Sequence, residues 1–322
     1  MNEILSICIP TYNRVSDVTD CIKDLIKKLG KYEIPIYVSD NASTDATSTE
    51  IIKLQSEYAF LFYYRNSKNV EADRNFEAVL KLSQTKYAWL LGDDDRISEQ
   101  HLSEILDRLA NNDYEMLVAG YSDDFKVKSK LFSDPKELLV ELGTSMTWIS
   151  VQIWNKKLIE AAPLAKYYDT NFIQFGSIFE KFSREFSGVY FLSKLCIYYS
   201  GNTSLQHWEF MRLKVFAKDW CEVVWMLPTF YDDVKSEVIL AMGRTNGVYE
   251  IKKLLRNREQ GEYDYKTYSL YKKYLPHVTK TSIVAFWIVS IIPINLVKIW
   301  FGLGKWYGES VRLPLRRLKK MK

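Results

Sequence analysis

Three consecutive carboxylates, Asp93, Asp94 and Asp95, are the residues of this sequence best suited to chemistry. They follow Gly92 and an apolar, aromatic run, Tyr87–Leu91, that predicts a strand buried on both faces. Adjacent carboxylates repel one another at low dielectric constant unless a cation lies among them. Their oxygens are hard donors that suit Mg²⁺ or Mn²⁺ bridging phosphate oxygens. A solvated acidic turn at the start of a helix could have the same sequence. The upstream elements must therefore distinguish a cation site from such a turn.

The upstream residues alternate between strand and helix patterns. This alternation predicts an α/β fold with a parallel sheet and helices on both faces, whose ligands lie beyond the carboxyl ends of the strands. No Gly-rich dinucleotide fingerprint and no P-loop follows the first strand, so neither kind of site is supported. The predicted strands are Ile4–Ile9, Ile34–Val38, Phe60–Tyr64 and Tyr87–Leu91, and the predicted helices are Val15–Leu29, 43–58 and Phe76–Leu82. Polar loops at Pro10–Arg14, Ser39–Asp45 and Asp93–Asp95 fall on the same edge of that sheet.

Charge is unevenly distributed along the 322 residues. The net charge is +4, but Lys305 and the residues after it hold seven Lys/Arg against one Glu, so residues 1–304 carry −2. The basic character therefore belongs to the C-terminal tail, and we expect no nucleic-acid partner for the globular body. The cysteines have neither metal-site nor disulfide spacing, which indicates a reducing compartment. No signal peptide is expected at the N-terminus.

Three segments together resemble the signatures of family 2 glycosyltransferases with the GT-A fold: Ile7–Arg14, Val38–Asp45 and Leu90–Asp95. The resemblance covers residues 3–110 well and 145–200 loosely. It implies a Rossmann-like, mostly parallel sheet flanked by helices. It also implies transfer of a hexosyl or deoxyhexosyl group, with inversion, from a nucleoside-diphosphate sugar in bacterial O-antigen or capsule synthesis.

The resemblance also implies roles for particular residues. Because the family more often has Asp where Gly92 stands, the main metal ligand shifts to Asp95, then Asp94, with Asp93 nearer the ribose. The cation would be Mg²⁺ or Mn²⁺. His207 follows a polar segment, 200–204, placed like a lid, and is a candidate for a further metal ligand or a phosphate contact; the alternative is an exposed loop histidine. The residues implied in nucleotide-sugar binding are Pro10, Thr11, Tyr12, Arg14, Asp40, Asn41, Ser43, Arg74, Asn75, Asp93 and Asp94.

The catalytic base is left open by the sequence. The family uses an Asp at a helix start beyond the acidic cluster, and here Gln174 stands in that region. An amide cannot accept a proton at neutral pH. The nearby carboxylates are Asp169 and Glu180; the alternative is that Asp169 caps a helix and Glu180 is solvated.

The remaining sequence predicts three parts: a catalytic domain at 1–205, a helical region at 206–280 and a membrane-associating segment at 281–322. Further strands are expected at Met116–Tyr121, Thr147–Trp154 and Val189–Tyr199.

The run Thr281–Val297 has no charge over seventeen residues, short of the roughly twenty that span a bilayer. We expect a monotopic or re-entrant anchor on the cytoplasmic face of the inner (plasma) membrane, and a lipid-linked oligosaccharide acceptor. The alternative is a core or oligomer-interface helix.

Two other function classes remain open from the sequence. A nucleotidyltransferase can share the alternating fold and an acidic cluster, although Pro10–Arg14 lacks the Gly-rich basic run that holds a triphosphate. A non-catalytic sugar-nucleotide-binding module would keep Asp40 and Asp93–Asp95 without a working base.

Overall fold

The computed structural model describes residues 1–200 and 213–307. The chain divides into two compact units. The first unit contains Met1–Gln206 and Glu222–Val238, and the second contains His207–Cys221 and Ile239–Lys322. This division differs from the expected three parts because the last helices pack against their helical neighbours and form no separate segment. All four cysteines (Cys8, Cys21, Cys196 and Cys221) are buried thiols.

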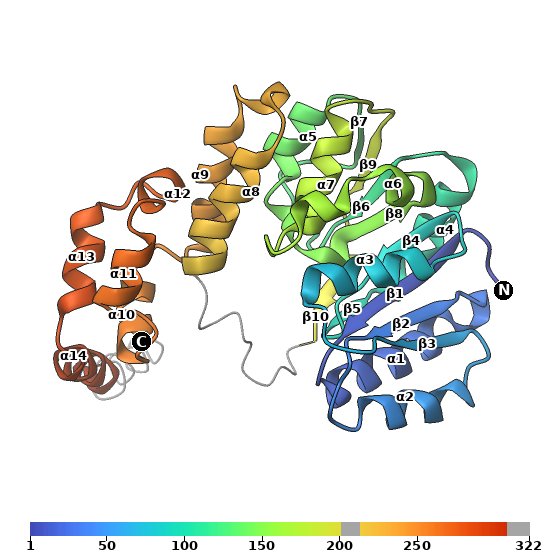
Figure 1. Cartoon of the computed structure of the whole chain (residues 1–322), viewed down its shortest axis with the longest axis horizontal. Coiled ribbons are helices and arrows are strands. Elements are labelled where there is room, and N and C mark those ends of the chain that lie inside the picture. Colours follow the sequence, from blue (N-terminus) through green and yellow to red (C-terminus); the bar gives the residue numbers. More distant parts are fainter. Residues whose placement is uncertain (201–212, 308–322) are drawn as a thin grey trace, which may run out of the picture. The chain divides into compact units, whose positions relative to one another are not determined.

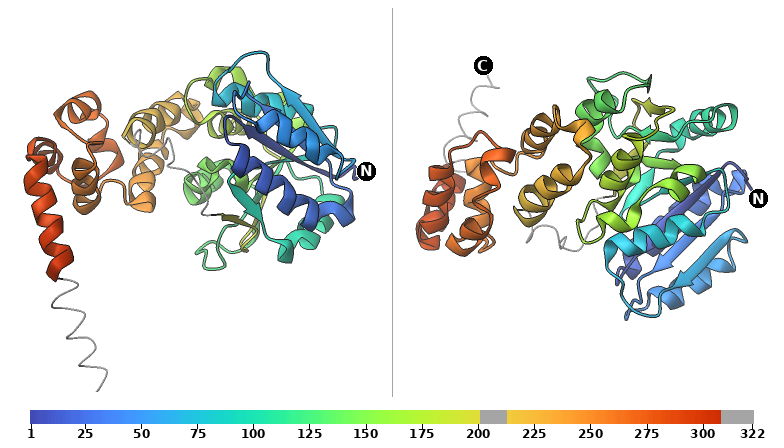
Figure 2. Two further views of the ribbon diagram at one scale, coloured as in Figure 1. Left: turned by 90° about the horizontal axis from the view of Figure 1, so that it is seen from below. Right: turned by 45° about the horizontal axis from the view of Figure 1, so that its top comes forward.

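The first unit is built on an eight-stranded sheet in the order β3-β2-β1-β4-β8-β6-β9-β7. Strands β1 to β4 are parallel, and the alternation of strands and helices predicted from the sequence is confirmed. Because β4 returns to the far side of β1, right-handed crossovers put α3 on the face opposite α1 and α2 (Figure 1, Figure 2). The elements are β1 (Leu5–Thr11), α1 (Val15–Leu29), β2 (Ile36–Asp40), α2 (Thr47–Gln55), β3 (Leu61–Arg65), α3 (Ala72–Leu82) and β4 (Tyr87–Leu90).

The second half of the sheet is mixed, because β8 runs antiparallel to both of its neighbours, β4 and β6. A separate two-stranded ribbon pairs β5 with β10. The elements are β5 (Asp95–Ile97), α4 (Leu102–Asn111), β6 (Met116–Ala119), β7 (Lys130–Phe132), α5 (Pro135–Leu142), β8 (Gln152–Asn155), α6 (Lys156–Ala161), α7 (Ile173–Phe182), β9 (Val189–Leu192) and β10 (Ile197–Tyr199).

Two of the expected strands are wrong in extent. The segment before β8 forms 3₁₀ turns at Ser145–Thr147 and Ile149–Val151, because its side chains and carbonyls serve neighbouring groups instead of a ladder. The run at 189–199 splits into β9 and β10, which belong to different sheets. Both differences bear on the acidic cluster, because Tyr199 of β10 pairs with Asp95 and the segment before β8 donates hydrogen bonds to it.

Helices make up the rest of the described chain. They are α8 (Trp220–Met226), α9 (Lys235–Asn246), α10 (Ile251–Glu259), α11 (Tyr265–Tyr271), α12 (Leu275–Val278), α13 (Ile283–Ile291) and α14 (Ile294–Tyr307). Helix α9 continues through Gly243 and ends at Asn246. A Cβ on Gly243 would lie 1.9 Å from the Val278 carbonyl oxygen, so this glycine allows close packing of two backbones.

The apolar C-terminal run forms two helices, α13 and α14, with a sharp bend between them. In the described part of the chain no single helix is long and apolar enough to cross a bilayer. Ile283–Ile291 and Ile294–Phe301 meet that length and composition only as a pair bent by 98°. The basic residues after 307 lie outside the described residues.

Candidate nucleotide-sugar site

The loops after β1, β2 and β4 meet at one edge of the sheet, as the sequence predicts. Thr11 and Asp40 are partners in the parallel register of β1 and β2. The Asn41 N–H donates to the Thr11 carbonyl over 2.9 Å, and the Thr11 hydroxyl donates to Asp93 Oδ2 over 2.8 Å. The polar residues named by the resemblance are therefore neighbours in space.

Pro10 and Tyr12 lie on either side of Thr11. Pro10 is buried within β1 opposite Ser39 and does not end the strand, since the ladder continues through the Thr11 carbonyl. The Tyr12 side chain emerges just beyond the strand, and the residue is 41% exposed. An exposed aromatic ring at this edge is suited to stack on a nucleobase.

The loops after β1 and β2 are joined by reciprocal hydrogen bonds. The Asn13 N–H donates to Ser43 Oγ over 2.8 Å, and the Thr44 N–H donates back to Asn13 Oδ1 over 2.7 Å. Asn13 has a φ of 51°, a left-handed conformation that asparagine tolerates. At the start of α2, Asp45 Oδ1 accepts the Thr47 N–H over 3.0 Å.

Asp40 is fully buried at the end of β2. Its Oδ1 accepts the Ser43 N–H over 2.8 Å, and its Oδ2 accepts the Tyr63 hydroxyl over 2.6 Å. The Arg65 guanidinium lies 3.4 Å from the same Oδ2. Burial and this contact raise the pKa of Tyr63 to about 12. Sequence reasoning missed Tyr63 and Arg65, although their i, i+2 spacing on β3 places both on the face that meets Asp40.

Asn41 and Asn75 hold backbone and side chains in place around this loop. The Val70 N–H donates to Asn41 Oδ1 over 2.9 Å. Asn75, only 3% exposed, accepts the Ser39 hydroxyl over 2.7 Å and donates to the Ser39 carbonyl over 3.1 Å. The Asn75 amide is thus engaged inside the protein.

Arg14 is the internal counter-ion of the acidic cluster. Its Nη1 lies 2.7 Å from Asp93 Oδ1 and its Nη2 lies 3.0 Å from Asp94 Oδ2. Its Nε also meets Asp17 at 3.2 Å. The sequence places Arg14 among nucleotide contacts, but spacing alone does not show that this guanidinium bridges two carboxylates.

Asp95 is 3% exposed and is held by two residues that sequence reasoning missed. Trp148 Nε1 donates to Asp95 Oδ2 over 2.7 Å, and the Ser150 hydroxyl donates to the same oxygen. Trp148 lies between the two 3₁₀ turns before β8, and Ser150 lies in the second of them. Burial, the largest influence, raises the pKa values of Asp93 and Asp95 to about 7. In the sequence, Trp148 and Ser150 stand out only as members of the expected strand Thr147–Trp154.

Gly92 explains why this chain lacks the family's more common Asp at that position. A Cβ there would lie 2.9 Å from Asp95 Oδ2 and 3.1 Å from Asp94 Oδ1. The carboxylates of Asp94 and Asp95 therefore occupy the space beside the Gly92 Cα, and a side chain at residue 92 would displace them.

The three carboxylates differ in how fully their oxygens are engaged by other groups. Both Asp93 oxygens are engaged, by Arg14 and Thr11. Among the described residues, no hydrogen bond engages Asp94 Oδ1 or Asp95 Oδ1. No set of three His, Cys, Asp or Glu converges within 1–200 and 213–307, so a cation here would take its other ligands from phosphate and water, as Mg²⁺ commonly does. His207 lies outside the described residues.

The two candidate bases have different environments. Asp169 has a side chain 67% exposed and an ion pair of 2.7 Å with Arg74, whose hydrogen bond lowers the pKa of Asp169. Glu180 is buried and accepts from Lys166 over 2.6 Å and from the Tyr167 hydroxyl over 2.9 Å. Burial alone would raise the pKa of Glu180, but these donors lower it on balance. The alternative of a solvated Glu180 is therefore wrong.

The loop before α7 is held by hydrogen bonds to Asp73 of α3. Asp73 Oδ2 accepts the Thr170 N–H over 3.1 Å and the Asn171 N–H over 3.3 Å. The loop contains two left-handed residues, with φ of 65° at Asp169 and 62° at Asn171. Burial raises the pKa of Asp73 to about 6. The alternative in which Asp169 caps a helix is wrong, since α7 has Phe172 at its N-cap.

Gln174 contacts the segment before β8 that also holds Asp95. It is 2% exposed, and its Nε2 donates to the Thr147 carbonyl over 2.9 Å. In the described part of the chain its buried Oε1 has no hydrogen-bond partner.

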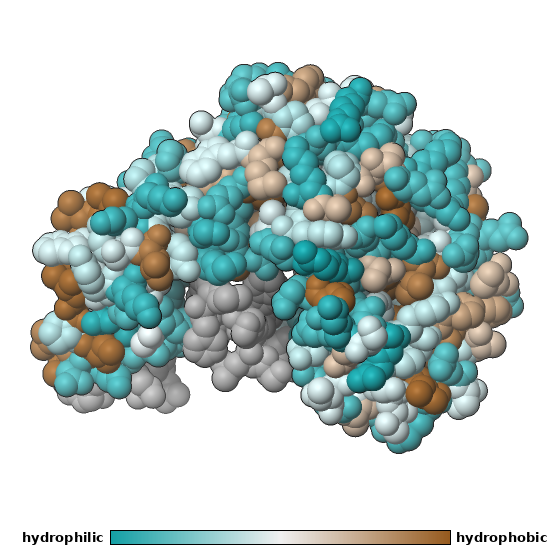
Figure 3. All heavy atoms as spheres, in the orientation of Figure 1, coloured by the Kyte–Doolittle hydropathy of each residue, from teal (hydrophilic) through white to brown (hydrophobic). Residues whose placement is uncertain are grey.

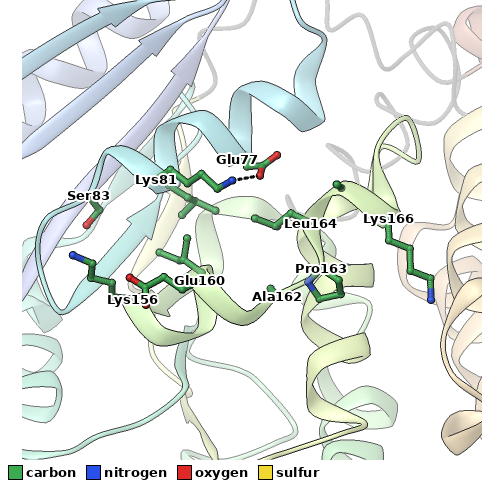
Figure 4. Close-up of a pocket in the computed structure, with 12 residues that line it drawn as sticks. Glu77, Lys81, Ser83, Lys156, Glu160, Ala162, Pro163, Leu164 and Lys166 are labelled. Carbon is green, nitrogen blue, oxygen red and sulfur yellow. Dashed lines mark hydrogen bonds and ion pairs between the residues drawn. The ribbon is translucent and has the colours of Figure 1, made fainter.

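A cavity of about 340 Å³ lies elsewhere in the first unit, between α3, α6 and the turn that follows α6. Glu77 and Lys81, which form an ion pair, line one side, and Lys156 and Glu160 line another (Figure 4). None of the predicted site residues lines it, so this cavity is distinct from the candidate site.

Comparison with solved structures shows likeness of fold. The chain resembles residues 1–349 of Staphylococcus aureus TarS with a TM-score of 0.54 and 15% identity, covering 83% of this chain and 82% of that one. It resembles the mannosyltransferase PcManGT of Pyrobaculum calidifontis with a TM-score of 0.51 and 13% identity, covering 91% and 87%.

Sequence relatives match a shorter stretch. Abequosyltransferase RfbV of Salmonella typhimurium is 38% identical over 106 residues, 31% of each chain. An uncharacterised glycosyltransferase of Mycoplasma genitalium, MG060, is 26% identical over 121 residues, 36% of this chain and 41% of that protein. The matches thus span less than half the length of these relatives. The family model for glycosyl transferase family 2 matches residues 6–171, a segment that contains every described carboxylate of the candidate donor site. The chain therefore belongs to glycosyl transferase family 2.

Proposed function

We propose that this protein transfers a sugar from a nucleoside-diphosphate sugar to a hydroxyl group of a glycan acceptor. The observation that carries the proposal is the convergence of Thr11, Arg14, Asp40 and Asp93–Asp95 at one edge of a family 2 domain. Family membership speaks against the alternative of a nucleotidyltransferase.

The donor would bind across the loops after β1, β2 and β4. TarS has been solved with UDP-GlcNAc and with UDP, and PcManGT with GDP-Man and Mn²⁺, which supports a donor of this class for the present chain. Tyr12 would stack on the base, and Asp40 would exchange the Tyr63 hydroxyl for the base edge. Asp93, fixed by Thr11 and Arg14, would face the ribose.

Asp94 and Asp95 would hold Mg²⁺ or Mn²⁺ through their unengaged oxygens. A divalent cation bound there supplies charge neutralisation for the diphosphate leaving group. The protein's own contribution is to keep the two carboxylates together: Trp148 and Ser150 orient Asp95, Arg14 holds Asp94, and Gly92 leaves room for both.

Asp169 is the better candidate for the base that takes the acceptor's proton. It is open to solvent, so an acceptor hydroxyl can reach it, whereas Glu180 is enclosed by Lys166, Tyr167 and Arg184. A base on the face opposite the leaving group gives inversion at the anomeric carbon. Arg74 would release Asp169 when the acceptor binds.

The test combines donor binding and turnover. Nucleotide sugars are screened by calorimetry with Mn²⁺ and with EDTA, and transfer is followed as release of nucleoside diphosphate. Asp95→Ala should abolish Mn²⁺-dependent donor binding and turnover. The control is Asp107→Ala, which removes an exposed carboxylate on α4 and should leave both unchanged. Unchanged turnover in Asp95→Ala would refute the assignment of the site, and donor binding by the wild type without any transfer would identify a binding module.

The acceptor proposal is more specific. We place the chain in surface-polysaccharide assembly, acting on a lipid-linked oligosaccharide; the similarity to abequosyltransferase RfbV supports this placement. Comparing a lipid-linked acceptor with its delipidated glycan measures how far the lipid matters. Asp169→Asn should lower kcat on either acceptor, and Glu180→Gln should change mainly stability.

A further inference from the structure

We infer that α13 and α14 form a surface that docks in the interface of an anionic lipid bilayer without spanning it. Helix α13 is apolar on both of its faces. Its inner face is buried in the second unit through Phe286, Val289 and Ser290, and the Phe286 carbonyl accepts the Tyr263 hydroxyl over 2.8 Å. The inner face is thus accounted for within the fold.

Packing within the second unit does not explain the apolar side chains on the outer face of α13. This face presents large apolar side chains at helical spacing, on the side opposite the buried residues. The exposed residues are Ile283 (38%), Val284 (56%), Trp287 (43%), Ile288 (45%) and Ile291 (45%). A contiguous apolar stripe of this kind marks an interaction site in a folded protein.

Helix α14 repeats the arrangement. Leu296, Ile299 and Trp300, at i, i+3 and i+4, are 57%, 57% and 54% exposed, while Val297 is buried. The Ile292 carbonyl at the bend accepts Arg258 Nε over 2.9 Å, so the bend is held within the second unit. Figure 3 shows hydrophobic surface gathered over α13 and α14 at the left of the view.

Charge identifies the partner as an anionic lipid surface. Residues 239–322 contain seventeen Lys/Arg and five Asp/Glu, while residues 1–238 contain 27 and 35. The basic residues are thus concentrated in the part of the chain that carries the apolar stripes. Lys280 and Lys298 are exposed beside them, and six further Lys/Arg follow residue 307. Apolar side chains, interfacial Trp and basic residues together are the signature of a helix lying in a lipid headgroup layer.

The bend between α13 and α14 indicates that the two helices lie in the bilayer interface and do not cross the bilayer. The two helices are bent by 98° at Ile292–Pro293, and each is much shorter than the roughly 20 residues that a span requires. A second copy of this chain is a weaker partner for the same surface, since two such units would repel each other through their net positive charge.

The test uses the purified full-length protein and vesicles. Cosedimentation should be strong with phosphatidylcholine vesicles containing phosphatidylglycerol and weak with phosphatidylcholine alone. Binding should fall steeply between about 0.15 M and about 1 M salt, where screening is strong. Ile288→Ser and Ile299→Ser should each weaken binding roughly tenfold, the effect of losing one buried apolar side chain.

Leu270→Ser is the matched control, because Leu270 on α11 is 59% exposed in the same unit but outside the stripes. It should bind vesicles as the wild type does. Circular dichroism checks that each variant is folded. Equal binding by all variants, or binding indifferent to anionic lipid, would overturn the inference. The inference would also be overturned if light scattering showed a dimer that Ile288→Ser dissociates and the wild type did not bind vesicles.

Discussion

Replacing Asp95 with asparagine should stabilise the metal-free protein at pH 8 while abolishing transfer. Asp95 titrates at about 7 in the folded state, against about 3.9 for an unperturbed Asp. The difference between these two pKa values corresponds to about 4 kcal/mol of stability that is lost when Asp95 is charged. Weaker hydrogen bonds from Trp148 and Ser150 to the neutral amide would cost about 1 kcal/mol, leaving a net gain of about 3 kcal/mol.

The sign of the pH dependence follows from the raised pKa. Below about pH 4 the carboxyl is protonated in both states and contributes no difference. Between about pH 4 and pH 7 the unfolded chain loses this proton and the folded protein keeps it, so stability falls as the pH rises. Above about pH 7 the penalty is complete. The advantage of Asp95→Asn should therefore be largest at pH 8 and vanish at the acidic end.

Urea unfolding in EDTA, followed by tryptophan fluorescence at several pH values, measures this difference. Mn²⁺ should then stabilise the wild type and leave Asp95→Asn unchanged, because a ligand stabilises only the state that binds it. Asp107→Asn serves as the exposed control. Equal free energies of unfolding for wild type and Asp95→Asn at pH 8 would refute the reasoning, as would Mn²⁺ stabilising both proteins equally.

Three further substitutions test other features. Gly92→Ala should weaken Mn²⁺ binding in calorimetry while leaving urea stability almost unchanged, since its Cβ displaces only the tips of two carboxylates; unaltered affinity would contradict this. Arg14→Gln should destabilise the protein by about 3 kcal/mol at pH 8 and by less at pH 5, where Asp93 can take up a proton; a loss independent of pH would argue against the pairing. Gly243→Ala should lower stability by about 2 kcal/mol or more, because the Val278 carbonyl must move, and wild-type thermal unfolding of this variant would refute the close approach.

The parallel half of the fold could be predicted because its signals are local. Each strand there is an apolar run with a polar loop behind it, and each helix has apolar residues at helical spacing. The meeting of Thr11, Asp40 and Asp93 followed from topology, since parallel strands bring their carboxyl ends to one edge.

The supports of the acidic cluster could not be predicted in this way. Strands β5 and β10 are three residues each, which is too short to show an alternation of apolar and polar residues. Each is a strand only because it pairs with the other. Trp148 and Ser150 meet Asp95 across more than fifty positions of sequence. Such contacts are set by packing of distant segments, so a single sequence gives little sign of them.

The reciprocal contacts of Asn13 with Ser43 and Thr44 constrain any attempt to alter sugar-nucleotide preference. Exchanging one of these two segments for that of a homologue would leave its partner with mismatched donors and acceptors, and the gain in recognition would be masked by local disorder. The effects of substitutions in the two segments should therefore be epistatic. Mutant libraries designed to change the sugar-nucleotide preference should vary both segments together.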